Sequence, residues 1–522
     1  MLTRRTLLAT AGSALAAPAV AQRASLLRFI PEADVAVLDP IWTTATVTRT
    51  HGYLVFDTLY GQAADYSMQP QMLAGHTVEN DGRLWRLTLR DGLRFHDGER
   101  VLARDAVASI TRFAARDAFG RALMDATDEL AAVSDGVIQF RLKKAFPLLP
   151  NALGKTGTSM PCIMPQRLAR TDPGKQVSEM VGSGPFRFKA DERIPGALLV
   201  YERNPDYVPR PDGPATFTSG PKLVHYDRVE WRVIPDASTA ANAMTAGEAD
   251  WWQQPTPDLQ PLLRRKGVQT RVLDPGGALG CLRFNCLYPP FDDPAIRRAL
   301  LGAVDQDAVM QAEAGDDRTL WKDHVGLFSP GTPMATAAGT EALAGPRDYA
   351  AVREALRQAG YRGEKVIALD PTDYPAIHAM ALVMVDALQQ CGMNVEVAAS
   401  DWGTVVQRRA VRKPPAEGGW NIFFTNLNGT NNFDPAGQLG LRGNGDAAWF
   451  GWPKAPRLEA LRDQWFDAPD LAAQQRICAE MQRTFFEDPT YLPLGAYYEA
   501  TATRKLEGVR MGFAQFYDVR PG

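Results

Sequence analysis

The sequence lacks an excess of charge of either sign. Its 522 residues include 57 Lys and Arg against 60 Asp and Glu, a formal net charge of −3. Because basic residues do not outnumber acidic ones, the chain is not expected to bind nucleic acid or an anionic membrane surface. Hydrophobic residues make up 45% and charged residues 22%, as in ordinary soluble globular proteins. The length predicts several domains.

The chain beyond its N-terminus also lacks a run that could span a bilayer. Its most apolar stretch, residues 376–388, contains His378 and Asp386 and is shorter than the ~20 residues that a spanning helix needs. At the N-terminus, Arg4 and Arg5 precede an apolar run over residues 7–17, and residues 19–21 (Ala-Val-Ala) provide a cleavage site. Residues 1–21 are therefore predicted to be a signal peptide of the twin-arginine type, and the mature chain is expected in the periplasm.

Cysteine and histidine are scarce, and they do not form a recognisable reactive motif. The five cysteines are an odd number for an exported chain, and most are expected to be small buried hydrophobic residues. The six histidines are scattered, and neither H-E-x-x-H nor G-x-S-x-G occurs. We therefore expect no enzyme and no cofactor. Two alternatives stay open: an exported hydrolase built from distant residues, and a metal or haem carrier using His51 and His378.

Local patterns predict an α/β protein. Residues 84–89 alternate as a half-buried strand, and a second short strand is expected at residues 93–95. Asp236 is expected to cap a helix that ends at Gly247, and an aspartate and a proline at residues 293–294 open another helix with apolar residues at helical spacing to residue 304. Asp348 opens a helix that Gly360 closes. Residues 366–397 read as strand, helix and strand, which implies parallel strands in a layered domain.

Aromatic and amide side chains gather near strand ends. Trp251 and Trp252 follow one extended segment, and a buried strand at residues 421–424 is predicted to run into an amide-rich loop from Thr425 onward. Such side chains can line a ligand cleft with stacking surfaces and neutral hydrogen bonds. They are equally consistent with a surface loop rich in turn-forming residues.

A series of motifs in a fixed order resembles the solute-binding proteins of ABC importers of the dipeptide/oligopeptide type, family 5. The resemblance runs from about residue 27 to the C-terminus. The segment at residues 85–98 (WRLTLRDGLRFHDG) is the most specific marker. The others are the segments at residues 38–40, 55–59, 103–107, 182–186, 203–207, 246–250, and 284–285 followed by 290–294.

The resemblance implies an α/β, two-lobed periplasmic binding protein fold with two hinge crossings. It also implies an extra subdomain inserted in the first lobe. Lobe I is predicted from residues 22–49, 171–273 and 492–522, the inserted subdomain from residues 50–170, and lobe II from residues 274–491. Such proteins enclose a small-molecule or peptide ligand and present it to ABC permease subunits in the inner membrane. We expect a monomer.

The resemblance also implies a set of ligand-binding residues. Peptide binders of this type carry an aspartate after the strand equivalent to residues 421–424, which pairs with the terminal ammonium of the peptide. This chain has Asn426, Leu427 and Asn428 there, and its first acidic residue is Asp434. We therefore hypothesise that it does not hold a free peptide N-terminus in the usual way, and that it binds a blocked peptide, an opine-like compound, a glycoside or another polar solute. The predicted ligand-binding residues are Trp42, Thr43, Tyr53, Trp251, Trp252, Asn285, Trp402, Thr425, Asn426 and Asn428.

Overall fold

The structure, a computed structural model, describes residues 25–522 apart from 158, 214, 346, 430–431 and 469. The predicted signal peptide, residues 1–21, lies outside the described residues. Two large β-sheets organise the rest of the chain. We call the part around the seven-stranded sheet lobe I and the part around the six-stranded sheet lobe II.

The lobe I sheet is mixed, with β1 near its middle. β1 pairs in parallel with β12 on one side and with β13 on the other. Val229 and Trp231 of β12 are buried and alternate with partly exposed neighbours. The strand order is β10 (Phe186–Phe188), β11 (Leu198–Arg203), β12 (Arg228–Arg232), β1 (Leu26–Ile30), β13 (Trp251–Trp252), β21 (Ala500–Thr503) and β14 (Gln269–Val272).

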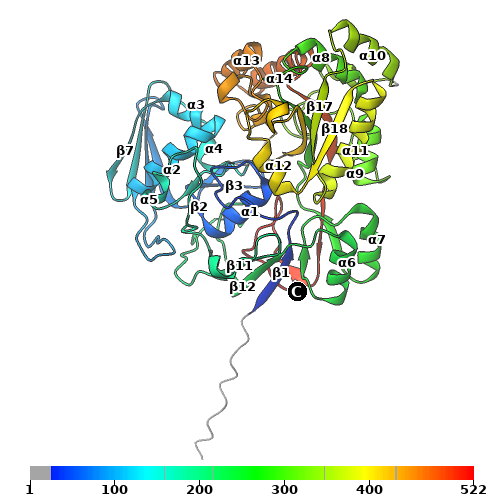
Figure 1. Ribbon diagram of the computed structural model, residues 1–522. Helices are drawn as coiled ribbons and strands as arrows, with labels where there is room; N and C mark the ends of the chain where they lie inside the picture. The colour runs from blue at the N-terminus through cyan, green and yellow to red at the C-terminus, as the bar shows by residue number, and fades with distance from the viewer. Residues whose placement is uncertain (1–24, 158, 214, 346, 430–431, 469) are drawn as a thin grey trace, which may run out of the picture.

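The lobe II sheet has a long buried strand, β19, between β15 and β17. β17 and β18 run parallel and are joined by helix α11 (Pro375–Gln390), which confirms the predicted strand–helix–strand unit. Figure 1 shows this unit in the upper part of the molecule, and the lobe I strands lie below it. The strand order is β16 (Trp321–Lys322), β20 (Tyr491–Tyr497), β15 (Ala278–Phe284), β19 (Ile422–Asn428), β17 (Lys365–Pro371) and β18 (Asn394–Ser400).

Between the described strands, the chain passes twice from one large sheet to the other. It passes once between β14 and β15 over residues 273–277, and once between β20 and β21 over residues 498–499. The first passage lies at the predicted border of residues 273 and 274. The second differs from the predicted border at residues 491 and 492, because all of β20 pairs with β15 in the lobe II sheet.

A separate antiparallel sheet lies within residues 73–142. Its β6 coincides with the strand predicted from alternation at residues 84–89. The strand predicted at residues 93–95 is not formed, because Arg94 makes only an isolated bridge with Arg100. The predicted border between residues 49 and 50 falls inside helix α1 (Thr46–Val55). The strand order in this sheet is β5 (Leu73–Glu79), β6 (Leu84–Leu89), β8 (Val137–Leu142) and β7 (Thr127–Ser134).

Three two-stranded sheets complete the β structure of the described residues. They pair β2 (Asp57–Thr58) with β9 (Cys162–Ile163), β3 (Tyr60–Gln62) with β4 (Met68–Pro70), and β22 (Leu506–Glu507) with β23 (Arg520–Pro521).

Aspartate caps begin several helices as predicted. The side chains of Asp236, Asp293 and Asp348 each accept a backbone N–H of the first turn. The helix after Asp293 is shorter than predicted, because it tightens into a 3₁₀ turn from Leu300. The other helices are α2 (Ala103–Arg116), α3 (Ala118–Ala126), α4 (Leu149–Gly154), α5 (Gln166–Ala169), α6 (Ala237–Ala246), α7 (Gln260–Arg265), α8 (Pro294–Ala299), α9 (Gln306–Ala314), α10 (Tyr349–Gln358), α12 (Trp402–Arg408), α13 (Pro456–Phe466) and α14 (Leu471–Glu487).

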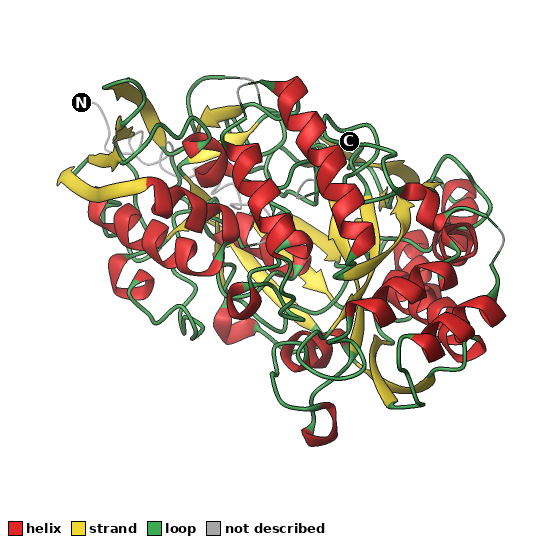
Figure 2. Ribbon diagram, turned by 90° about the horizontal axis from the view of Figure 1, so that it is seen from above, coloured by secondary structure: helices red, strands yellow, loops and turns green. Residues whose placement is uncertain are grey.

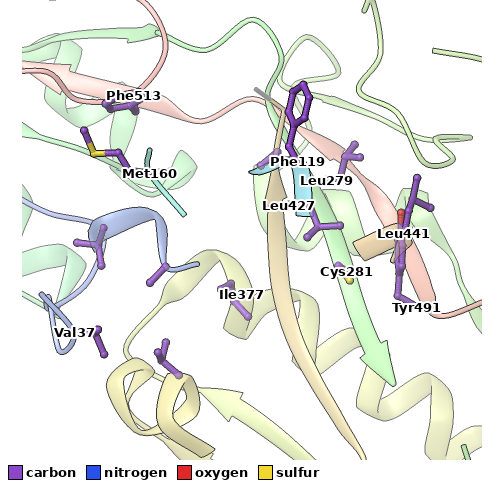
Figure 3. Packing of buried hydrophobic residues seen from close by; sticks show 14 of the residues in the cluster. Val37, Phe119, Met160, Leu279, Cys281, Ile377, Leu427, Leu441, Tyr491 and Phe513 are labelled. Carbon is purple, nitrogen blue, oxygen red and sulfur yellow. The ribbon is translucent and has the colours of Figure 1, made fainter. Parts of the chain in front are cut away.

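Helices pack against the strands of both lobes, as the view from above shows (Figure 2). One large apolar cluster continues through both lobes. Figure 3 shows Cys281, Leu427 and Tyr491 packed within it. All five cysteines are unpaired and four are buried, which confirms the prediction of small buried hydrophobic residues.

Candidate functional site

Three adjacent cavities lie between the two lobes. The largest, of about 420 Å³, is lined by lobe I residues such as Glu32 and Trp252 and by lobe II residues such as Glu313. A central cavity of about 50 Å³ shares Glu32 and Glu499 with it. A third cavity, of about 40 Å³, shares Thr46, Asn426 and Asn428 with the central one. A volume near 420 Å³ is within the range of small-molecule sites in proteins.

The cavity of about 420 Å³, here called the acidic cavity, is lined by carboxylates. The described residues that line it include no Lys, Arg or His. Trp252, Tyr497 and Tyr498 add aromatic surface to its wall. Its carboxylates are Glu32, Asp258, Glu313, Asp373 and Glu499.

Both passages between the lobes bring a carboxylate to these cavities. Asp274 follows β14, and Glu499 lies between β20 and β21. Burial raises the pKa of Asp274 to about 6. Burial, and then the nearby charges of Glu32 and Asp274, raise the pKa of Glu499 to about 8. Burial also raises the pKa of Glu313, and Glu499 adds to this effect. Mutually repelling carboxylates in a dry site favour protonated forms.

The amide of Asn426 links two tyrosines that face these carboxylates. Its Nδ2 atom donates to the Tyr497 hydroxyl at 3.0 Å and lies 3.3 Å from the Tyr374 hydroxyl. The Tyr374 hydroxyl in turn donates to Glu32 at 3.3 Å, and this contact crosses from lobe II to lobe I. Glu32 also accepts from the side chains of Gln253 and Gln254, each at 3.1 Å. Neutral donors therefore hold the Glu32 carboxylate in place.

Arg49 lines the central cavity, and it forms no ion pair with any residue that the structure describes. It lies on α1, is 3% exposed, and places its guanidinium 4.1 Å from the centre of the Phe513 ring. Among the described residues, its Nε and Nη1 atoms have no hydrogen-bond partner. Burial lowers its pKa, and the charges of Glu32 and Asp274 partly oppose that effect.

Arg409 is the charged residue among the described lining of the third cavity, here called the Arg409 cavity. It follows α12, is 1% exposed, and its Nη2 atom lies 3.4 Å from the Thr44 hydroxyl of lobe I. The rings of Trp402 and Phe450 lie 5.2 and 5.0 Å from its guanidinium carbon. Among the described residues its Nε has no partner, and burial lowers its pKa to about 9.

The lobes touch on several sides of these cavities. Besides the contact between Tyr374 and Glu32, the Trp449 indole donates to the Thr44 hydroxyl at 3.2 Å. On the side of the separate antiparallel sheet, Lys144 pairs with Asp467 at 2.7 Å. These contacts join the two lobes in the described structure.

Half of the residues predicted to bind ligand line these cavities. Trp252 faces the acidic cavity, and Trp402, Thr425, Asn426 and Asn428 line the Arg409 cavity. The last three belong to β19 instead of the predicted loop, because β19 pairs with β15 along its full length from Ile422 to Asn428.

The other predicted residues do not line these cavities in the described structure. The indole nitrogen of Trp42 donates to the Gly174 carbonyl, and Thr43 is buried. Tyr53 packs against Phe513 at a ring distance of 4.9 Å. Trp251 and Asn285 have structural contacts: the Trp251 indole donates to Thr501, and the Asn285 amide donates to the Trp420 carbonyl.

The charged residues Glu32, Arg49, Glu313, Arg409 and Glu499 were missed by sequence reasoning. A usable signal existed for two of them. Glu32 lies two residues after the end of the apolar strand β1, and Glu499 lies two residues after the end of the fully buried strand β20, so each carboxylate comes just beyond a core strand. Arg49 and Arg409 are ordinary helix and helix-end residues in sequence, and only tertiary packing buries them.

The residues suggested for a metal or haem carrier do not meet. His51 is buried with its Nδ1 2.9 Å from the Tyr201 hydroxyl, and burial lowers its pKa to about 3. His378 lies 2.9 Å from Asp370. Within the described part of the chain, no group of three or more His, Cys, Asp or Glu side chains is arranged to hold a metal ion. No described helix is both long and apolar enough to cross a membrane.

Solved structures of known proteins share this arrangement. DppA from Helicobacter pylori, in complex with the peptide STSA, superposes with a TM-score of 0.77 at 20% identity, over 95% of this chain and 98% of that one. AgaA from A. tumefaciens R10, in complex with agropinic acid, gives a TM-score of 0.76 at 18% identity, over 95% and 99%. The fold is therefore that of the two-lobed periplasmic binding proteins.

Sequence comparison identifies the family. The model of the bacterial extracellular solute-binding proteins, family 5, matches residues 67–449. The chain is also 35% identical over 465 residues to the probable peptide ABC transporter periplasmic-binding protein y4tO of Sinorhizobium fredii (strain NBRC 101917 / NGR234), covering 88% of this chain and 87% of that protein. This chain belongs to the bacterial extracellular solute-binding proteins of family 5, which confirms the resemblance found in its motifs.

Proposed function

We propose that this protein captures a peptide or peptide-like polar solute between its two lobes and delivers it to the permease subunits of an ABC importer in the inner membrane. The observation that carries this proposal is the set of cavities enclosed by residues from both lobes. A site of this kind needs no reaction: a ligand that contacts both lobes stabilises their closed arrangement by its differential affinity for it. The permease would then bind the protein in that closed arrangement of the two lobes.

Export to the periplasm is part of the proposal. The signal-peptide pattern at residues 1–21 supports it, and the arginines at positions 4 and 5 support the twin-arginine route. Replacing both arginines with lysine should retain the precursor in the cytoplasm. Full export of that variant would rule out the twin-arginine route without affecting the proposal of solute binding.

The names and bound ligands of similar proteins indicate which class of ligand to expect. y4tO is named a probable peptide transporter component, and DppA and AgaA were solved with a peptide and with agropinic acid. Peptides and opine-like compounds are small, polar and rich in amides or carboxylates, and the amide and tyrosine groups of β19 and its neighbours can hydrogen-bond such groups.

Mass spectrometry of solutes released from the protein purified from the periplasm tests the proposal. We expect a small polar solute that, added back to stripped protein, raises the melting temperature and reduces the radius of gyration as the lobes close. A strain without this protein should lose uptake of that solute. Solute binding without any loss of uptake would contradict the transport role.

A further inference from the structure

A contact between aromatic rings joins the separate antiparallel sheet to lobe II, away from the cavities described above. We call residues 73–146, which contain that sheet, the small-sheet region. Phe119 of α3 and Phe146, which follows β8, each place a ring 5.9 Å from the ring of Phe466 at the end of α13, and their own rings lie 6.4 Å apart. Figure 1 shows α3 on the side of the small-sheet region that faces lobe II, where α13 lies. The three rings therefore pack as one group across the border between the two parts of the protein.

The small-sheet region is firmly attached to lobe I. Arg112 of α2 pairs at 2.7 Å with Asp39, which follows β1, and both side chains are at most 1% exposed. The backbone N–H of His96 donates to the carbonyl of Gly182, just before β10, at 2.8 Å. Breaking a buried ion pair would leave a charge uncompensated, so these contacts are expected to persist when the lobes separate. The small-sheet region should therefore move with lobe I as one body.

The contact of the small-sheet region with lobe II is of a different kind. Its ion pair, between Lys144 and Asp467 at 2.7 Å, is exposed, with 60% and 65% of the two side chains accessible. A cavity of about 480 Å³ lies beside the rings and is lined by Phe146 from one side and by Arg442 and Phe466 from the other. Protein cores are close-packed and seldom contain such a void. These surfaces can therefore separate without unpairing a buried charge.

Lobe II holds the ring of Phe466 in place for this contact. Arg462 lies one turn earlier on α13, and its guanidinium carbon is 4.9 Å from the centre of the Phe466 ring. The Nε and Nη2 atoms of Arg462 donate to the carbonyls of Pro435 and Ala436 at 2.9 and 3.1 Å, which fixes the guanidinium. A ring that is already oriented loses little conformational freedom when its partners arrive, so the contact forms at a low entropic cost.

We propose that Phe119, Phe146 and Phe466, with the ion pair of Lys144 and Asp467, form a latch that holds the lobes closed from outside the ligand site. The ligand-free protein then occupies the closed arrangement for a measurable share of the time, and the latch sets how much of the closing free energy a solute must supply. This inference rests on the proposed function in one respect, the opening and closing of the lobes. The latch residues are absent from the described lining of the three cavities, so the latch raises solute affinity without contacting the solute.

Small-angle X-ray scattering of the full mature protein, stripped of solute, tests the latch. The scattering gives the radius of gyration and the ratio of closed to open molecules. Phe466→Ala removes both ring contacts across the border and should lower that ratio by about threefold to tenfold, with a larger radius of gyration. Phe188→Ala is the matched control, because it removes a half-buried ring that packs against His51 and Tyr201 within lobe I. That variant should leave the ratio unchanged.

A charge exchange tests the ion pair with exposed residues alone, so it decides the proposal even if Phe466→Ala folds poorly. Lys144→Glu sets two negative charges against each other and should lower the ratio of closed to open molecules by about twofold to fivefold at low salt. Combining Lys144→Glu with Asp467→Lys restores the attraction and should return the ratio toward that of the wild type. Arg141→Glu is the control, because its partners Asp128 and Glu129 lie in the small-sheet region itself.

Several outcomes would overturn the latch. A ligand-free wild-type protein that scatters only as the open arrangement would contradict it. An unchanged ratio of closed to open molecules in both Phe466→Ala and Lys144→Glu would do the same, and so would a charge exchange that fails to recover the ratio. These measurements need no solute. The solutes released from purified protein and the uptake phenotype therefore decide the proposed transport function separately.

Discussion

Nδ2 of Asn426 donates a hydrogen bond of 3.0 Å to the hydroxyl of Tyr497, so that the end of β19 holds a tyrosine at the end of β20. The same amide approaches Tyr374, whose hydroxyl reaches Glu32 in lobe I. Glu499 lines the acidic cavity together with Tyr497, whose side chain partly offsets the rise in the pKa of Glu499. One neutral amide therefore directs two hydroxyl groups toward the carboxylates of the acidic cavity.

Asn426→Asp should destabilise the protein. An aspartate accepts where the amide donates, so both tyrosines would turn their hydroxyl hydrogens away from Glu32 and Glu499, and another carboxylate would join a crowded acidic site. We expect a loss of about 1–3 kcal/mol in the free energy of unfolding, measured by urea denaturation at about pH 8. Asn242→Asp on the exposed side of α6 is the control. A loss no greater than in that control would contradict the role of Asn426.

Stability should fall as pH rises. Glu499 has a pKa of about 8 in the folded protein against an ordinary value of 4.5, so the folded state binds a proton that the unfolded state has released between these values. Its contribution is fully present below about pH 4.5 and is lost as pH rises through about 8, on a scale of a few kcal/mol. Asp274, with a pKa of about 6, adds the same sign of effect at lower pH.

Urea unfolding of ligand-free protein between about pH 6 and 9 measures this dependence. Glu499→Gln has no proton to lose, so its stability should change less over that interval. A pH profile parallel to that of the wild type would show that Glu499 is not the titrating group.

Asp39→Ala should be strongly destabilising. Asp39 is buried, pairs with the buried Arg112 at 2.7 Å, and accepts the backbone N–H groups of Ile41 and Val177. Removing one partner of a buried pair leaves the other charge uncompensated, at a cost of about 3–5 kcal/mol. The exposed pair of Asp128 and Arg141 is the matched control, and Asp128→Ala should cost less than about 1 kcal/mol. Equal losses in the two variants would contradict this explanation.

Gly182→Ala should disturb the packing between α1 and the segment before β10. A Cβ atom at position 182 would lie 2.1 Å from the carbonyl oxygen of Val55. The backbone must shift to relieve that contact, and overpacking of this kind costs about 1–3 kcal/mol. Gly136→Ala has nothing within 4 Å of the added atom and should be nearly neutral in thermal unfolding. A neutral Gly182→Ala would contradict the close approach.

Much of the fold could be predicted because it follows from patterns within short segments of the sequence. The alternation at residues 84–89, the caps at Asp236 and Asp348, and the strand–helix–strand unit around α11 are properties of short segments. The asparagine-rich segment after Phe424 predicts a loop, because asparagine favours turns. Full pairing with β15 overrides that preference and keeps residues 425–428 in β19.

The charged part of the site could not be predicted in the same way. Glu32, Arg49, Glu313, Arg409 and Glu499 come from five separate segments, and only the packing of two lobes brings them to one row of cavities. The adjacent residues Trp251 and Trp252 show a related limit of prediction from sequence. Trp251 and Trp252 point to opposite faces of a two-residue strand, so one enters the core and the other lines the acidic cavity.

The most direct test of the proposed binding site is the number of protons released when a short unmodified peptide binds at about pH 7. Calorimetry in buffers of different ionisation enthalpy gives this number. An ammonium group entering the acidic cavity favours ionised carboxylates, so Glu499, largely protonated in the free protein, should release about one proton per peptide bound, and Glu499→Gln should release much less. Binding without proton release in the wild-type protein would contradict the account.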